Sequence, residues 1–304
     1  MKIANTTGDL ARYNISKFEK VRILHDAGFR YIDLSLYQEK YPDSFSLAEN
    51  WKDNIKRLQD YAHSLGMEFV QAHSVGGNPL NKDGSYEMLL KSTIRSIEVC
   101  GMLGIKNTVV HSGVMSGIGK EEYFERNLEF YKLLFPYMEK HNVNVLIENG
   151  TKANQRDDYF FFTGKDMKEF IDYAGHPLLK ACWDTGHANI EGHQYEDIMT
   201  LGKDLHAIHF NDNRGKGDEH IMPFLGTMSM DEVMHGLIDS DFDGYFTLEC
   251  DSSLRPFKYW QGDRRDYKLD NRLQNPPLCL AEAMESVLYK TAKYILEQYG
   301  LFEE

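Results

Sequence analysis

The sequence predicts a single-domain α/β protein in which eight parallel strands and their helices form a (β/α)8 barrel over residues 1–304. Short apolar runs alternate with amphipathic runs of helical length, and the count reaches eight of each. Regular alternation of this kind implies parallel strands joined by right-handed crossovers. Glycine also recurs between a helical run and the next strand, as at Gly28, Gly66 and Gly104. A doubly wound open sheet is the alternative architecture, and no linker or change of composition indicates a second domain.

The expected strands are short apolar runs that precede or follow the helical patterns. In chain order they are Lys2–Asn5, Tyr31–Ser35, Glu68–His73, Asn107–His111, Asn144–Glu148, Leu179–Asp184, Ala207–Phe210 and Tyr245–Cys250. The helical patterns are Ile15–Ala27, Leu47–Leu65, Tyr86–Leu103, Lys120–Lys140, Lys165–Tyr173, Met230–Ile238 and a last helix at Leu280–Tyr299. Gly28, Gly66, Gly104 and Gly175 stand just after helical runs, where a left-handed residue ends many helices.

One long irregular segment, residues 251–277, lies between the eighth strand and the last helix. It is polar and rich in Arg and Tyr. Loops of this length inside a compact domain usually cover an active site or contact another subunit. Its cationic and aromatic cluster is expected in a solvated or subunit-contact loop, with a grip on a substrate phosphate or carboxylate as the alternative; the cluster comprises Arg255, Lys258, Trp260, Arg264 and Arg265. The sequence therefore leaves open whether the protein forms a homo-oligomer.

Composition limits which partners and which cellular compartment we expect for this protein. Lys and Arg number 34 against 47 Asp and Glu, which gives a net charge of -13. Such a chain repels phosphate backbones unless it has a local basic stripe, so we expect no nucleic-acid partner. The four cysteines have no paired spacing and are expected as reduced thiols. The sequence starts directly with a strand pattern and has no apolar run of membrane-spanning length, so we expect a cytoplasmic protein without a membrane partner.

Most of the expected strands end in a polar or charged residue. In barrel order these strand-end residues are Asn5, Asp33, His73, His111, Glu148, Asp184, His209 and Glu249. Parallel strands of a barrel all end at one face, where barrel active sites are built. Because side chains alternate inward and outward along a strand, one residue at each strand end can face the barrel axis.

Four of these residues form a candidate metal site: Glu148, Asp184, His209 and Glu249. Carboxylate oxygens together with imidazole suit Mn²⁺, Mg²⁺, Co²⁺ or Zn²⁺. We expect one divalent ion there. For any one carboxylate the alternative is a helix N-cap or a solvated loop residue. For His73 and His111 the alternative is a hydrogen-bonded histidine that fills the barrel mouth.

The motifs around these residues resemble a known family. They are Val109–Gly113, Ile147–Asn149, Trp183–His187, His209–Asp212 followed by Asp218–His220, and Leu248–Glu249. By these motifs the chain resembles the xylose isomerase-like TIM barrels, which include sugar and sugar-phosphate isomerases and epimerases and the endonuclease IV group of DNA-repair enzymes. The resemblance implies that Glu148, Asp184, His209 and Glu249 bind a metal.

The resemblance also implies roles for further residues. His187 would contact a substrate oxygen, and Arg214 lies near the position where ketose epimerases use an arginine for the substrate. We also expect His73 and His111 at the substrate. The endonuclease group holds three zinc ions, and the positions that it adds match His73, His111, His187, Asp218 and His220. Asp218 and His220 are thus additional candidate metal ligands.

The predicted function is therefore a metal-dependent isomerase or epimerase of a sugar or sugar phosphate, which transfers a proton through a metal-stabilised enediolate. Glu148 and Glu249 are cast as the acid and base, since carboxylates on opposite faces of a sugar can move a proton once the carbonyl is polarised. The alternatives are an endonuclease IV-like zinc phosphodiesterase, which the negative charge disfavours, and a metal-dependent keto-cyclitol dehydratase. A barrel that binds a sugar without turnover is the non-enzymatic alternative.

Overall fold

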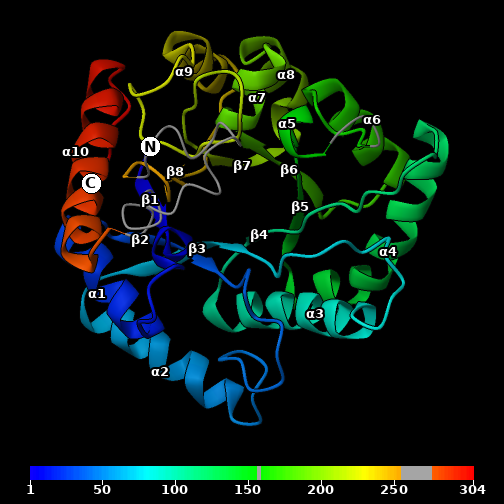
Figure 1. Ribbon diagram of the computed structural model, residues 1–304, viewed down its shortest axis with the longest axis horizontal. Coiled ribbons are helices and arrows are strands. Elements are labelled where there is room, and N and C mark those ends of the chain that lie inside the picture. The colour runs from blue at the N-terminus through cyan, green and yellow to red at the C-terminus, as the bar shows by residue number, and fades with distance from the viewer. Residues whose placement is uncertain (156–158, 255–275) are drawn as a thin grey trace, which may run out of the picture.

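Eight parallel strands form the centre of the computed structural model, which describes residues 1–155, 159–254 and 276–304 (Figure 1). They are β1 (Ile3–Thr6), β2 (Tyr31–Ser35), β3 (Glu68–His73), β4 (Asn107–Val109), β5 (Asn144–Glu148), β6 (Leu179–Asp184), β7 (Leu205–His209) and β8 (Phe246–Leu248). Their order is β7-β6-β5-β4-β3-β2-β1-β8. The ring closes where Phe210 pairs with Leu248 and its N–H donates to the Thr247 carbonyl at 2.7 Å. The predicted (β/α)8 barrel is confirmed.

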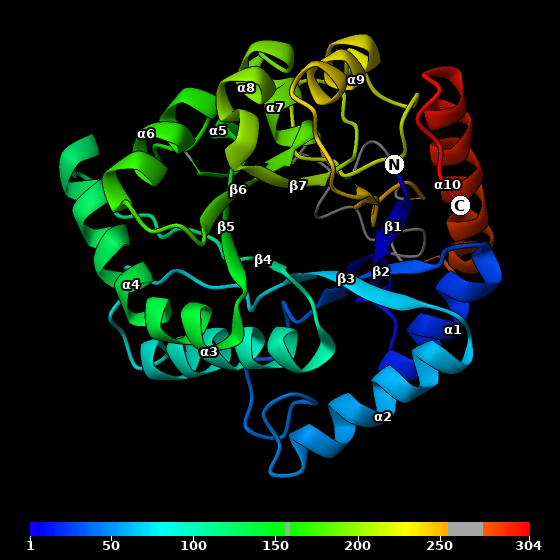
Figure 2. The same cartoon turned by 180° about the vertical axis from the view of Figure 1, so that it is seen from behind.

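Helices surround this ring, as the views from the front and from behind show (Figures 1 and 2). They are α1 (Lys17–Ala27), α2 (Trp51–Ser64), α3 (Tyr86–Leu103), α4 (Lys120–His141), α5 (Lys152–Gln155), α6 (Gly164–Ala174), α7 (Thr185–Glu191), α8 (Tyr195–Leu201), α9 (Met230–Asp239) and α10 (Leu278–Gln298), with short 3₁₀ turns η1 (Thr7–Leu10) and η3 (Gly202–Asp204). The first and last helices pack side by side, and Arg22 of α1 pairs with Glu282 of α10 at 2.9 Å. No helix in the described part is long and apolar enough to cross a membrane.

The predicted helix ends agree with the backbone. Gly28, Gly66, Gly104 and Gly175 all have positive φ, between 62° and 115°. Ser16 and Thr163 begin α1 and α6, because each side-chain oxygen accepts a hydrogen bond from an N–H of the first turn. The helical pattern expected at Leu47–Leu65 is shorter in the structure, because its first residues form turns before α2.

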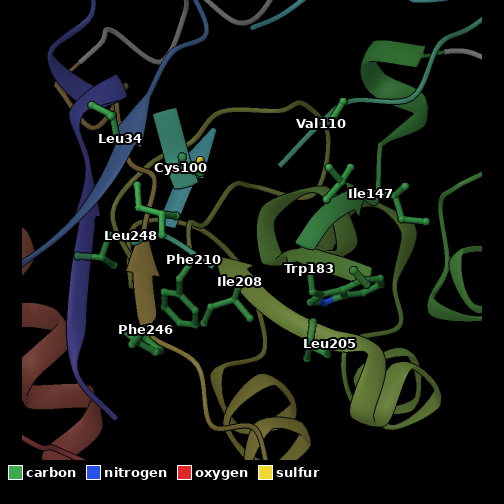
Figure 3. Close-up of a cluster of buried hydrophobic side chains, with 14 of the residues drawn as sticks. Leu34, Cys100, Val110, Ile147, Trp183, Leu205, Ile208, Phe210, Phe246 and Leu248 are labelled. Carbon is green, nitrogen blue, oxygen red and sulfur yellow. The ribbon is translucent and has the colours of Figure 1, made fainter. Parts of the chain in front are cut away.

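The strands separate an outer apolar layer from the barrel interior. Ile147, Trp183 and Ile208 belong to the large core between strands and helices (Figure 3). Their neighbours on the opposite face form a smaller buried cluster of Val109, Leu146, Cys182 and Ala207. Because side chains alternate along a strand, the residues two positions after Leu146, Cys182 and Ala207 also face the interior. That alternation directs the strand ends of β5, β6 and β7 toward one site.

The segment 251–277 is described only in part. Arg12 of the loop after β1 pairs with Asp251 at 2.7 Å, and the Tyr13 hydroxyl donates to the Pro276 carbonyl at 2.9 Å. Both ends of the segment thus contact the loop that follows β1. The cluster expected in this segment lies outside the described residues; it comprises Arg255, Lys258, Trp260, Arg264 and Arg265.

Candidate metal centre

Four side chains from neighbouring strand ends meet at the mouth of the barrel. Glu148, Asp184 and His209 end β5, β6 and β7, and Glu249 follows β8. One ligand atom from each residue lies within 4.8 Å of the others. His209 Nδ1 is 2.5 Å from Glu148 Oε1 and 3.2 Å from Glu249 Oε2. The structure thus brings together the four residues that the sequence proposed as one metal site.

The charge of this group suits a cation. Three carboxylates face one imidazole, and Glu148, Asp184 and His209 are almost completely buried. Burial opposes the charged form of His209, but surrounding anionic groups, including Glu249 and Glu148, raise its pKa well above the usual range. Burial likewise opposes ionisation of Glu148, yet His209 and His111 hold its pKa well below the ordinary value. Three carboxylate oxygens, two of them from buried residues, and one nitrogen are a donor set that fits a divalent metal, which would take the place of the imidazole proton.

Glu249 has a different environment from Glu148. Its side chain is 22% exposed, whereas that of Glu148 is 5% exposed. Burial raises the pKa of Glu249, against the influence of His209 and His220, and the charges of Glu148 and Asp184 add to the increase. The two glutamates of the site therefore have pKa values shifted in opposite directions.

Asp184 is both a member of this group and a helix cap. Its Oδ1 accepts the backbone N–H of His187 at 2.7 Å and so begins α7. Its Oδ2 accepts from the Asn211 amide at 2.8 Å. Asn149 fixes the backbone of Asp184 from the neighbouring strand end, with hydrogen bonds of 2.7 and 2.9 Å. The N-cap alternative and the ligand interpretation therefore describe the same side chain.

Gly186 explains why this strand end can approach its neighbour. A Cβ at this position would lie 1.9 Å from the Asn211 side-chain oxygen. Any larger residue would displace the amide that holds Asp184. The sequence Asp184-Thr185-Gly186-His187 thus combines a candidate ligand, a helix cap and a close backbone approach.

A pair of histidines extends the site toward β3 and β4. His73 Nε2 lies 3.1 Å from His111 Nε2, which in turn lies 2.8 Å from Glu148 Oε2. The His73 Nδ1–H donates to the Ser74 carbonyl at 2.9 Å, which leaves Nε2 as the free ligand atom. Burial, with the neighbouring His111, lowers the pKa of His73 to about 4. A neutral imidazole is the form that binds a metal or accepts a substrate hydroxyl.

A second group of histidines lies on the other side of Asp184. His187 Nε2 is 3.3 Å from Asp218 Oδ2, and His220 Nε2 is 2.9 Å from Asp218 Oδ1. The His187 Nδ1–H donates to the Asn149 carbonyl at 2.7 Å. Burial opposes protonation of His187, but Asp184 and Asp218 raise its pKa to about 10. These residues form a further cation-compatible group, because ligand atoms of Asp184, His187 and His220 also lie within 4.8 Å of one another.

A cavity of about 570 Å³ opens above these side chains. Its lining includes seven of the proposed site residues: His73, His111, Glu148, His187, Asp218, His220 and Glu249. Asp184 and His209 are buried and do not line it. Arg214 is not part of the lining, and its guanidinium pairs with Glu219 at 2.5 Å. Cavities of this size accommodate small organic ligands.

Two further strand-end residues lie deeper in the barrel. The Asp33 carboxylate accepts from the Gln71 amide at 2.8 Å and lies 3.6 Å from His209 Nε2. A carboxylate behind a ligating imidazole orients the ring. The Asn5 amide donates to Glu285 of α10 at 2.6 Å. Asp33 thus lies behind His209 without a hydrogen bond to it, while Asn5 ties the barrel to its last helix.

Sequence reasoning missed part of the cavity wall. Tyr37 and Gln38 line it from the loop after β2, and Asn154 and Gln155 line it from α5. The Tyr37 ring meets those of His73 and His111 edge-on, with centroids 5.4 and 5.9 Å apart. The available signal was that Tyr37 follows a predicted strand by two residues, but loop side chains have no periodicity that shows their direction.

Comparison with known proteins shows which family this sequence matches. Residues 21–268 match the family described as xylose isomerase-like TIM barrel. A probable endonuclease 4 of Sulfurihydrogenibium is 25% identical over 174 residues, which are 52% of this chain and 61% of that protein. Two relatives of unknown function are matched over 69% and 61% of their length.

Solved structures share the whole barrel at low sequence identity. A D-tagatose 3-epimerase-like protein superposes with a TM-score of 0.70, at 18% identity, over 98% of this chain and 99% of that one. The IolI protein with a bound zinc atom superposes with a TM-score of 0.74, at 16% identity, over the full length of both chains. At this level of identity the likeness establishes the fold.

Proposed function

The chain belongs to the xylose isomerase-like TIM barrel family, and from that premise we propose that it is a divalent-metal-dependent isomerase or epimerase of a sugar or sugar phosphate. One observation carries the proposal: Glu148 and Glu249 converge with Asp184 and His209 within 4.8 Å at the floor of a cavity of about 570 Å³. Two carboxylates beside a cation position suit the removal and return of a proton next to a carbonyl. The epimerase named among the structural neighbours supports this reaction class.

The residues of the site have different roles, which follow from their positions. Glu249 is the more exposed of the two glutamates and lines the cavity, so it takes the proton from the substrate carbon. Glu148 lies deeper, between His209 and His111, and would return a proton to the substrate from its other side. A bound divalent ion would polarise the carbonyl and stabilise the negative charge that develops next to it. His187, whose Nδ1–H is held by Asn149, lines the cavity from the other side, and its Nε2–H, which now faces Asp218, would donate to a substrate oxygen.

Metal content and solvent exchange test the proposal together. Elemental analysis of the purified protein is expected to give about one divalent ion per chain, with zinc or manganese as the first candidates. In deuterated water the protein should introduce deuterium next to the carbonyl of at least one member of a panel of ketohexoses and their phosphates. A metal-loaded protein that exchanges none of these hydrogens would contradict the proposal. Loss of water from a keto-cyclitol in a parallel assay would instead support the dehydratase.

A second candidate is an endonuclease IV-like zinc phosphodiesterase, and a specific observation favours it. Two histidine groups flank the central four residues, so the site has room for more than one ion; they are His73 with His111, and His187 with Asp218 and His220. The endonuclease 4 relative matches about half of the chain. Against it stands the net charge of -13. Three zinc ions per chain, together with incision of duplex DNA at an abasic site, would select this function.

An Asp218→Asn variant separates the two functions. In a three-zinc enzyme it should lower the zinc content by about one ion and abolish incision, because Asp218 bridges the outer histidines. In a one-metal epimerase the metal content should stay the same. Deuterium exchange then depends on Glu249 rather than on Asp218.

A further inference from the structure

A second cavity adjoins the candidate metal centre. It has a volume of about 480 Å³ and lies between the start of α1 and the loops that follow β1 and β2. Ala11, Ser35 and Gln38 line both this cavity and the one above the metal centre. A molecule with its reacting carbon at Glu249 can therefore extend into the second cavity without leaving the barrel mouth.

The second cavity is basic in an otherwise acidic protein. Arg12, Lys17 and Lys20 line it, together with one carboxylate, Glu39. Arg12 is neutralised by Asp251 at 2.7 Å and Lys17 by Glu39 at 2.9 Å. Within the described part of the chain, Lys20 has no carboxylate at ion-pair distance. One positive charge of the cavity is thus left without a counterion from the described residues.

The surroundings of Lys20 make that charge costly. Phe18 and Phe45 contribute aromatic rings to the cavity wall, with centroids 6.2 Å apart. Burial, with the neighbouring Lys17, lowers the pKa of Lys20 to about 8. An anion bound here would be held strongly because the apolar wall weakens solvent screening.

We propose that this cavity, lined by Lys20, Lys17 and Gln38, is a subsite for an oxyanion, a phosphate or carboxylate group, carried by the substrate at a position remote from the reacting carbon. The inference rests on the proposed function, and it narrows the substrate to an anionic sugar derivative. Ammonium groups and a side-chain amide can donate several hydrogen bonds to such a group. Arg12, which is paired with Asp251, also lines the subsite.

Binding of simple anions to the metal-loaded protein tests the subsite without turnover. Inorganic phosphate and acetate are titrated by calorimetry into the wild type, Lys20→Gln and a control, Lys91→Gln, whose lysine is exposed on α3 and lies outside the cavity. Lys20→Gln should weaken binding of the preferred anion at least about tenfold, and Lys91→Gln should leave it unchanged. Preference for phosphate or acetate identifies the substituent. Equal affinity in all three proteins, or no binding to the wild type, would overturn the subsite.

Exchange kinetics distinguish failure of this inference from failure of the proposed function. With a substrate that carries the anion, Lys20→Gln should raise KM about tenfold and leave kcat largely unchanged, since Lys20 lies away from Glu249. Exchange that is equally fast with neutral sugars and unaffected by Lys20→Gln would refute the subsite and leave the isomerase intact. Anion binding that depends on Lys20, in a protein that exchanges no sugar hydrogen, would keep the subsite and refute the isomerase.

Discussion

Glu148 and Glu249 show how one residue type acquires two characters within one site. Glu148 contacts two imidazoles and its side chain is only 5% exposed, so its pKa is held low despite burial. Glu249 stands at the cavity wall, where burial raises its pKa. Opposite shifts in a pair of carboxylates are typical of sites in which one carboxylate acts as the base and the other as the acid.

Replacing Glu249 with Gln should separate proton transfer from metal binding. The amide keeps one oxygen ligand but cannot accept a proton, so deuterium exchange into the substrate should fall by about 10²- to 10⁴-fold. Metal content should remain close to that of the wild type. Glu122→Gln, an exposed position on α4, is the matched control and should retain full exchange. Persistent exchange in Glu249→Gln would assign the base to another residue.

Glu285 predicts a pH dependence of stability. Burial raises its pKa from 4.5 to about 8, against the hydrogen bond from Asn5. Between these values the folded protein holds a proton that unfolding releases, so the free energy of unfolding falls as pH rises, by up to about 1.4 kcal/mol per pH unit. Between about pH 5 and about pH 8, wild type should therefore lose more stability in urea unfolding than Glu285→Gln.

The control for this measurement is Glu297→Gln, an exposed position on the same helix. It should follow the pH dependence of the wild type. Parallel curves for wild type and Glu285→Gln would show that Glu285 is already ionised in the folded protein at neutral pH.

At the scale of elements, helix α7 depends on a side chain of the site. It has seven residues and begins at Thr185, with Asp184 as its N-cap. Asp184→Asn keeps a good cap but removes the charge, whereas Asp184→Ala removes both. In urea unfolding with chelator present, the Ala variant should be about 1 kcal/mol less stable than the Asn variant.

The metal content of these two variants provides the second measurement. Both should bind the ion more weakly than wild type, because each lacks the carboxylate. Equal stability of the two variants without metal would mean that the cap contributes nothing to α7. Full metal content in Asp184→Asn would remove this residue from the ligand set.

Sequence reasoning recovered the parallel strands best, because most of them are short apolar runs that end at a polar residue. The strands Tyr31–Ser35, Glu68–His73 and Asn144–Glu148 were predicted to the residue. Helices α7 and α8 were not predicted, since seven residues are too few to show a helical period. Strands β4 and β8 were predicted to be longer than they are, because His111 and Cys250 already belong to the loops at the barrel mouth.

At the scale of the whole molecule, the barrel brings residues that are far apart in the sequence together in one site. Once parallel strands were predicted, the alternation of side chains was enough to bring Glu148, Asp184 and His209 together. The second cavity could not be predicted in this way. Its residues Lys20 and Gln38 reach their positions from a helix start and a loop, and no strand register fixes those directions.

Metal removal should therefore lower the stability of the whole barrel. Without an ion the strand ends β5, β6 and β8 hold three carboxylates around a single imidazole. At a free metal concentration about a hundredfold above Kd, binding to the folded state adds roughly 2.7 kcal/mol to the free energy of unfolding. For a domain of this size, chelation should lower Tm by roughly 4–8 °C. Chelation should lower the Tm of Glu148→Gln much less than that of the wild type, because Glu148 contacts both His209 and His111. A calorimetric scan in which chelator changes Tm equally in the wild type and in Glu148→Gln would place the bound metal elsewhere on the protein.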